Sequence, residues 1–174
     1  MAVYRFDSKE PKIGRDCYIA DSAEVIGDVV IGDGCYVGPN AVIRGDYGSI
    51  VIGNETAVEE GVIIHARPKE RTTIGNRVTL GHGAIIHNCR IDDNAVIGMG
   101  AVVSDYAEVR EWGVVAEGAV VKNKTVVESN CIFAGVPAKQ VGQIDEDYKN
   151  LWSKFKGIYV ELSRTYRDRL KKIS

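Results

Sequence analysis

The sequence lacks long apolar runs and a strong excess of either charge. Its 174 residues carry a formal net charge of −2, which gives no basic footprint for nucleic acid and no patch for a membrane surface. No apolar stretch is long enough to span a bilayer, and the N-terminal segment MAVYRFDSKEPKIG has no apolar core of a signal peptide. We therefore expect a cytoplasmic protein without nucleic-acid or membrane partners.

Cysteine and histidine are also scarce. The four cysteines form no CxxC pair, which argues against a zinc site built from thiolates. Only three histidines are present, His65, His82 and His87. Any site that depends on imidazole groups must therefore draw on this small set.

A six-residue repeat fills most of the chain. Each unit opens with an aliphatic residue, glycine is frequent at the second position, and the fifth position is nearly always small, as at Ala41 and Ala84. Cys17, Cys35 and Cys131 occupy this fifth position, where they are expected to act as small apolar groups. The units start at Ile13, Ile19, Val25, Ile31, Val37, Ile43, Ile52, Val58, Ile64, Ile74, Leu80, Ile86, Ile91, Ile97, Val103, Val109, Val115, Val121, Val127 and Phe133.

The repeat predicts an all-β solenoid. A β-branched opening residue suits a strand that faces a narrow interior, and glycine with a small fifth residue suits a tight corner. A single unit cannot bury its apolar row, but stacked coils can. Three units to a coil give roughly seven coils of a triangular prism over residues 1–142. A β-sandwich is disfavoured because its turns would not recur at a fixed six-residue step.

After Val141 the periodicity becomes helical. Asp145 can cap a helix, and Gly157 is expected to divide a short helix from a longer one. Residues 143–174 are therefore predicted to form a C-terminal α-helical segment that packs along the prism or across a subunit interface. Its apolar residues are interpreted as packing residues and recur in steps of three or four: Tyr148, Leu151, Trp152, Phe155, Tyr159, Leu162, Tyr166, Leu170 and Ile173.

The repeat breaks in three units, which begin at Ile43, Ile64 and Ile86. The first two units are too long and the third is too short. Because each lies three units from the next, all three fall on the same side of the prism. Insertions in repeat proteins map to loops on one face, and such loops often carry function. This side is therefore predicted to carry the site.

The histidines follow this register. Arg44, His65 and His87 each come second in an irregular unit, so we expect them to stack in one column, ~4.8 Å apart per coil. His82 precedes His87 by five residues, about 16 Å of extended chain at ~3.3 Å per residue. A threefold homo-oligomer would let His82 of one subunit join His65 and His87 of another. Three imidazoles with one open position are typical of a catalytic zinc site, although iron or cobalt also suits imidazole.

Four segments, Arg44–Asp46, Gly61–His65, Gly81–His87 and Ala134–Lys139, resemble the γ-class carbonic anhydrases and their relatives among the hexapeptide-repeat proteins. The resemblance covers most of the chain. It implies a left-handed parallel β-helix and a homotrimer with metal sites shared between subunits. It also implies a zinc-bound hydroxide that converts carbon dioxide to bicarbonate. Arg44 and Asp46 would pair across the subunit interface.

Two positions depart from that pattern. The family's glutamine, six residues before the first histidine, is replaced by Glu59, which we interpret as the catalytic group that orients the metal-bound water. The acidic residue that follows the Arg-x-Asp motif is replaced by Tyr47. Tyr47 and Glu70, in the loop after His65, are the candidates for a proton route.

Three functions therefore compete. The first is a carbonic anhydrase that depends on zinc. The second is a hexapeptide-repeat acyltransferase, in which a lone histidine acts as the base and the acyl group comes from a coenzyme A thioester. The placement of all three histidines at metal-ligand positions argues against this alternative, because it leaves no histidine spare to act as the base. The third is a trimeric metal-binding scaffold with little activity. The fold alone does not decide among them, because a prism of this kind hosts all three.

Overall fold

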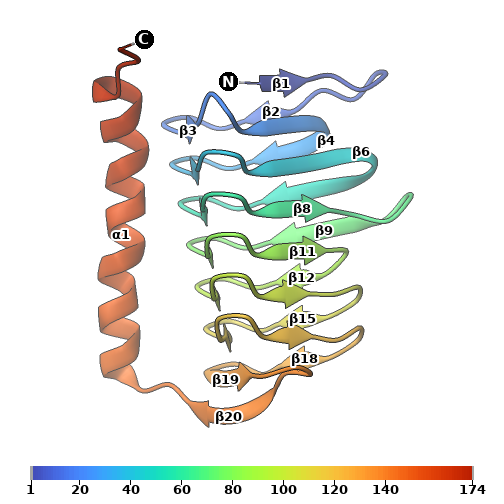
Figure 1. Ribbon diagram of the computed structural model, residues 1–174, viewed down its shortest axis with the longest axis vertical. Coiled ribbons are helices and arrows are strands. Elements are labelled where there is room, and N and C mark those ends of the chain that lie inside the picture. Colours follow the sequence, from blue (N-terminus) through green and yellow to red (C-terminus); the bar gives the residue numbers. More distant parts are fainter. Residues whose placement is uncertain (1, 174) are drawn as a thin grey trace.

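The computed structural model describes residues 2–173, so Met1 and Ser174, the outer ends of the two predicted segments, lie outside the described residues. Short strands wind around a three-sided prism, and one long helix lies along it (Figure 1). Seven strands of the first side pair in parallel, one from each coil. The predicted left-handed parallel β-helix with a C-terminal helix is thereby confirmed.

The strands divide among the three sides of the prism. The first side holds β3 (Tyr18–Ile19), β5 (Tyr36–Val37), β7 (Ala57–Val58), β10 (Thr79–Leu80), β13 (Val96–Ile97), β16 (Val114–Val115), β19 (Cys131–Ala134) and the antiparallel β20 (Lys139–Gln143). The second side holds β1 (Ala2–Tyr4), β8 (Ile63–His65), β11 (Ile85–His87), β14 (Val102–Val103) and β17 (Val120–Val121). The third side holds β2 (Lys12–Ile13), β9 (Arg71–Ile74), β12 (Arg90–Ile91), β15 (Glu108–Val109) and β18 (Val126–Val127).

Two longer strands, β4 (Glu24–Ile31) and β6 (Val42–Ile52), bend from the second side to the third. The first irregular unit is thus absorbed into β6, which pairs with β8 at one end and with β9 at the other. The second irregular unit instead forms a loop between β8 and β9 that projects from the prism (Figure 1). Only this insertion adds a loop over the predicted site.

The opening residues and the small fifth residues of the units form the interior, as the repeat predicts. The opening residues of the units point inward, and Ile43, Ile64 and Ile86 are fully buried. The small fifth residues Ala41 and Ala84 are fully buried at the corners. The apolar rows of successive coils join into one continuous core.

The glycines act differently from the prediction. Left-handed backbone occurs at the fourth position of the unit, directly before the fifth, as at Gly61 (φ 71°) and Gly83 (φ 69°). The second-position glycines instead allow adjacent coils to approach closely. A Cβ atom on Gly98 would lie 2.5 Å from the backbone nitrogen of Glu117 in the next coil.

The C-terminal segment forms one helix, α1 (Glu146–Arg169), which runs back along the first side from the last coil to the first (Figure 1). The Asp145 side chain caps it by accepting a hydrogen bond from the Tyr148 N–H. The helix passes through Gly157 without a break, so the prediction of two helices is wrong. A glycine inside a helix costs only about 1 kcal/mol relative to alanine, which packing against β3, β5 and β7 can offset.

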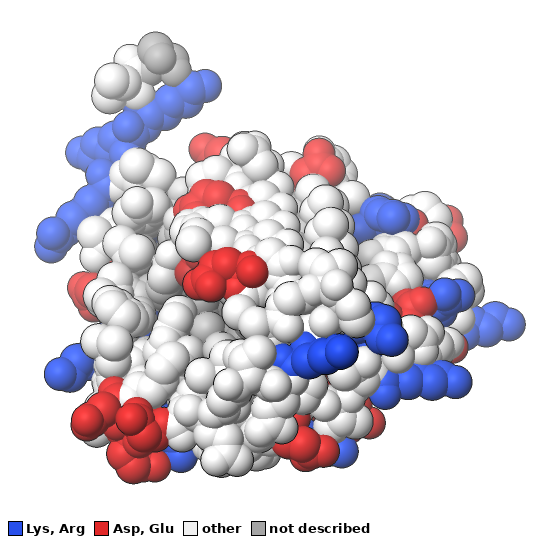
Figure 2. Space-filling model, turned by 60° about the horizontal axis from the view of Figure 1, so that its bottom comes forward, with Lys and Arg blue, Asp and Glu red and all other residues white. Residues whose placement is uncertain are grey.

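Charged side chains of both signs are scattered over the face shown in Figure 2. A row of basic side chains marks the C-terminal end of α1 and the residues beyond it, where Arg167, Arg169, Lys171 and Lys172 lie. Among residues 2–173 there is no helix whose length and apolarity would let it cross a membrane.

The two kinds of glycine predict opposite effects of alanine. Gly98→Ala should lower the free energy of unfolding by about 1–3 kcal/mol, the usual cost of overpacking, because the new methyl group meets the backbone of the next coil. Gly157→Ala should raise it by about 0.5–1 kcal/mol, because space around this helical residue is open. Urea unfolding of both variants measures the difference, and equal stabilities would contradict the coil-contact explanation.

Candidate functional site

The column predicted on the second side of the prism is confirmed. Arg44 pairs in register with His65, and His65 pairs in register with His87, on the neighbouring strands β6, β8 and β11. The irregular units therefore bring together residues that are far apart in the sequence.

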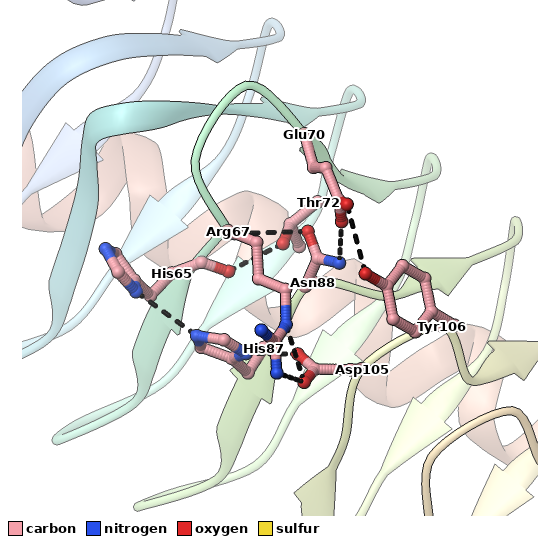
Figure 3. A network of polar contacts seen from close by, with 8 residues as sticks. All are labelled: His65, Arg67, Glu70, Thr72, His87, Asn88, Asp105 and Tyr106. Carbon is pink, nitrogen blue, oxygen red and sulfur yellow. Dashed lines mark hydrogen bonds and ion pairs between the residues drawn. The ribbon is translucent and has the colours of Figure 1, made fainter.

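The imidazoles of His65 and His87 face one another. His65 Nδ1 lies 3.3 Å from His87 Nε2. The outer nitrogens each meet a carboxylate, with His65 Nε2 3.0 Å from Asp46 Oδ1 and His87 Nδ1 2.5 Å from Asp105 Oδ1. Figure 3 shows the two rings and Asp105. The four side chains form a row, Asp46–His65–His87–Asp105, which we call the histidine pair and its carboxylates.

Both carboxylates are held in the ionised form. Burial acts to raise the pKa of Asp46, but hydrogen bonds from His65, the Tyr47 N–H and Arg44 keep that pKa below its usual range. The Arg67 guanidinium, with a further contribution from His87, keeps the pKa of Asp105 below its usual range. An ionised carboxylate only accepts hydrogen bonds. Each outer imidazole nitrogen must therefore carry the hydrogen.

This assignment leaves the two facing nitrogens, His65 Nδ1 and His87 Nε2, without a hydrogen. A neutral imidazole has one N–H and one lone pair, so His65 Nδ1 and His87 Nε2 direct lone pairs toward each other across 3.3 Å. Burial lowers the pKa of His65 and so favours its neutral form. Two facing lone pairs repel until they share a proton or a cation. The site is therefore built to accept one of these.

The projecting loop holds Asp105 in place. Arg67 donates to Asp105 Oδ2 from Nε at 2.8 Å and from a terminal nitrogen at 2.5 Å (Figure 3). The loop is anchored in turn, since Asn88 Oδ1 accepts from the Arg67 N–H at 3.2 Å and the Thr72 hydroxyl donates to the His65 carbonyl at 2.6 Å. Sequence reasoning did not find Asp105 or Arg67.

The two candidates for a proton route lie in different surroundings. The Tyr47 ring packs edge-on against the His65 ring, with centroids 4.9 Å apart. Glu70 is turned toward the Asn88 amide and the Tyr106 hydroxyl, the latter at 3.0 Å (Figure 3). Tyr47 thus contacts the histidine pair, whereas Glu70 braces the far end of the loop.

His82, in the turn between β10 and β11, meets Glu59, in the turn between β7 and β8, at another corner of the prism. His82 Nε2 lies 3.1 Å from Glu59 Oε2, and His82 Nδ1 lies 2.6 Å from Glu60 Oε2. Glu59 is 5% exposed, and burial raises its pKa. Within residues 2–173 no three His, Cys, Asp or Glu side chains of one chain are arranged to hold a metal ion. The predicted three-histidine site, with Glu59 beside its water, requires a second subunit and stays a prediction.

Arg44 and Asp46 form an ion pair within one chain. The resemblance implied a pair between subunits. In the pair seen here Arg44 helps to keep Asp46 ionised, and Asp46 in turn orients His65.

The surroundings of His65 predict pKa changes of opposite sign. Asp46→Asn should lower the pKa of His65 further, because the Asp46 carboxylate favours the imidazolium. Arg44→Met should raise it, because the Arg44 charge disfavours the imidazolium. NMR titration of the histidine ring protons in chelator-treated protein measures both changes, with His65→Asn to assign the signal. Shifts of the same sign in both variants would contradict the ionised-carboxylate assignment.

Two solved structures resemble the whole chain. A proposed acetyltransferase, the product of the BC4754 gene of Bacillus cereus, is 30% identical, with a TM-score of 0.94 over 96% of this chain and 97% of its own. A hexapeptide transferase family protein from Anaplasma phagocytophilum is 32% identical, with a TM-score of 0.91 over 95% of this chain and 98% of its own.

A curated relative, the carnitine operon protein CaiE of Proteus sp., is 40% identical over 65 residues, which are 37% of this chain and 33% of that protein. The chain thus matches about a third of the length of this relative. These similar proteins are described as transferases or as CaiE, and not as lyases. The prediction of a carbonic anhydrase is therefore wrong. The chain carries the motifs that suggested that activity, but the two structures that match it over its whole length bear transferase names.

The model of the bacterial transferase hexapeptide family matches residues 10–45 and 71–105. The first stretch ends one residue after Arg44, and Asp46 and His65 lie between the two stretches. Together with the full-length likeness to the hexapeptide transferase of Anaplasma phagocytophilum, the match establishes that the chain belongs to the bacterial hexapeptide-repeat transferase family.

Proposed function

We propose that the protein is an acyltransferase that moves an acyl group from a coenzyme A thioester to an amine or hydroxyl acceptor. The observation that carries the proposal is the pair of bare nitrogens on His65 and His87, oriented by two ionised carboxylates. A general base needs a free lone pair on an oriented imidazole. The transferase names of the full-length relatives support the same class of reaction.

The proposed reaction uses the histidine pair as its base. The acceptor gives its N–H or O–H proton to a facing nitrogen of the pair, and the second imidazole shares that proton. The nucleophile attacks the thioester carbonyl, the new C–N or C–O bond forms, and the C–S bond breaks. The departing sulfur takes the proton and leaves as coenzyme A thiol. Asp46 and Asp105 stabilise the transient positive charge on the two rings, as the carboxylate of a catalytic triad does.

The assembly is proposed to be a homotrimer, a state that hexapeptide-repeat proteins commonly adopt. Next to the histidine column, Ile63 and Ile85 are 45% and 42% exposed on adjacent strands. Neighbouring exposed aliphatic residues favour burial against another chain. A subunit placed on this side would enclose the histidine pair.

The acyltransferase proposal predicts the effect of removing the base. His87→Asn should lower the rate of acyl transfer by ~10²–10⁴, the usual contribution of a positioned base, while coenzyme A binding measured by calorimetry is retained. The assay follows release of free thiol from acetyl-coenzyme A with a panel of amine and alcohol acceptors. The matched control is Glu108→Gln, which removes a carboxylate on the third side. Full activity of His87→Asn, or no thioester binding by the wild type, would contradict the proposal.

A second candidate function, metal binding at the same pair, is favoured by one distance. In a tetrahedral site with Zn–N bonds of ~2.0–2.1 Å, two ligand nitrogens lie ~3.3–3.4 Å apart. The facing nitrogens of His65 and His87 are 3.3 Å apart. We propose that they can hold a zinc, iron or cobalt ion together with His82 of a second subunit, with each outer N–H fixed by a carboxylate.

Metal analysis after anaerobic purification tests this candidate. Wild-type protein should contain metal, and His65→Ala, His82→Ala and His87→Ala should each lose it. A chelator should lower the melting temperature of the wild type and leave that of His87→Ala unchanged, because only a bound ion stabilises the folded state. Full metal content in His82→Ala would exclude the site shared between subunits without affecting the acyl-transfer proposal.

A further inference from the structure

A cavity of about 490 Å³ lies between α1 and the first side of the prism. Its floor is formed by apolar residues of three successive coils, Val96, Val114 and Ile132. The volume falls within the ~300–1,000 Å³ range of small-molecule sites. The histidine pair and its carboxylates do not line it, whereas Glu59 and His82 do, so the cavity is separate from the pair but includes the corner where Glu59 and His82 meet.

The helix contributes an aromatic wall to the cavity. Tyr148, Trp152, Phe155 and Tyr159 are spaced at steps of four, three and four residues, which places them on one face of α1. Trp152 and Phe155 pack edge to face, with ring centroids 5.7 Å apart. The sequence indicated packing residues here. Tyr159 does pack against Tyr36 of β5, with ring centroids 5.3 Å apart, but all four rings also line the cavity, and Phe155 remains 43% exposed.

The charged groups that line the cavity are mainly acidic. Glu59 and Glu117 both lie in its wall, and His82 lies with them. The His82 ring is itself held between the carboxylates of Glu59 and Glu60.

Lys156 is buried beside the aromatic wall, with its amine 5.7 Å from the Trp152 ring centroid, and it donates to the Thr79 hydroxyl at 3.2 Å and to the Ala95 carbonyl at 3.1 Å. Burial lowers the pKa of Lys156 to about 7, so its positive charge is lost above that pH and it then no longer competes with a cation for the Trp152 ring.

We propose that this cavity binds a small organic cation, a quaternary or alkylated ammonium group carried on an apolar body. Aromatic rings attract such cations through their π faces, most strongly where water is excluded. The carboxylates of Glu59 and Glu117 add attraction of the same sign. The phosphates of coenzyme A would be repelled by these carboxylates, which distinguishes the cavity from a thioester site.

The aliphatic floor of the cavity explains why the ligand needs an apolar body. The floor residues are aliphatic and offer no hydrogen-bond partner on their side chains, so a fully hydrated cation would lose water there without replacement. A ligand with an apolar portion over Val96, Val114 and Ile132 and a cationic portion against the rings matches both the floor and the aromatic wall. The inference does not depend on the proposed acyl transfer, because it uses no residue of the histidine pair.

Tryptophan fluorescence provides a local test. The chain has two tryptophans, and Trp112→Phe leaves Trp152 in the cavity wall as the reporter. The probe is benzyltrimethylammonium, compared with its neutral carbon isostere neopentylbenzene, and calorimetry on the wild type checks each affinity. The cation should change the emission of Trp152 and should bind at least about tenfold more tightly than the isostere, the size of a desolvated cation–π contact.

Matched variants separate the charge from the packing. Glu117→Gln should weaken binding of benzyltrimethylammonium several-fold and leave neopentylbenzene unaffected, because the side chain keeps its shape and loses its charge. The control Glu24→Gln, on β4 and outside the cavity, should change neither affinity.

Two results would overturn the inference. Equal affinity for the cation and its isostere would mean that the cavity selects only for apolar surface. No binding of either probe, with sedimentation showing an oligomer, would mean that a second copy of the chain covers the cavity.

Discussion

The in-register stacking of parallel coils is the constraint on which the rest of the structure depends. Adjacent coils lie ~4.8 Å apart, and the second-position glycines let their backbones approach without a side chain between them. Stacking converts a sequence separation of one coil into a contact. Asp105 meets His87 over 18 residues, and Asn88 meets Glu70 over the same separation. The in-register stacking of the coils therefore brings His87 and Asp105 together.

This regularity explains which features the sequence could predict. The repeat predicts the solenoid, and the register of the irregular units predicts the column of Arg44, His65 and His87. Asp105 follows the same rule of one coil and could have been found from its distance to His87. Arg67 could not, because its position depends on the path of an insertion that the repeat does not determine. The sequence analysis placed the corner glycines at the second position of the unit, whereas the left-handed residues lie at the fourth. Spacing alone does not distinguish a glycine needed for a left-handed turn from one needed for a close contact between coils.

The reaction was harder to predict than the site. His65 and His87 occur within motifs that resemble the γ-class carbonic anhydrases, yet the full-length relatives bear transferase names. The physical reason is that two oriented lone pairs serve equally as a base or as metal ligands. Residue type and register determine where the nitrogens lie. The reaction depends on what a neighbouring subunit and the substrates place opposite them.

The path of α1 has a consequence for how the solenoid comes apart. A stack of coils with contacts only between neighbours frays from its ends, one coil at a time. Here α1 follows the last coil, contacts the middle through Lys156 and reaches the first coil, where Ser163 donates to the Asp16 carbonyl and Arg167 pairs with Asp16. The helix thus connects the last coil of the stack to the first. Peeling of either terminal coil must first detach it, so the chain should unfold as one cooperative unit rather than unravel.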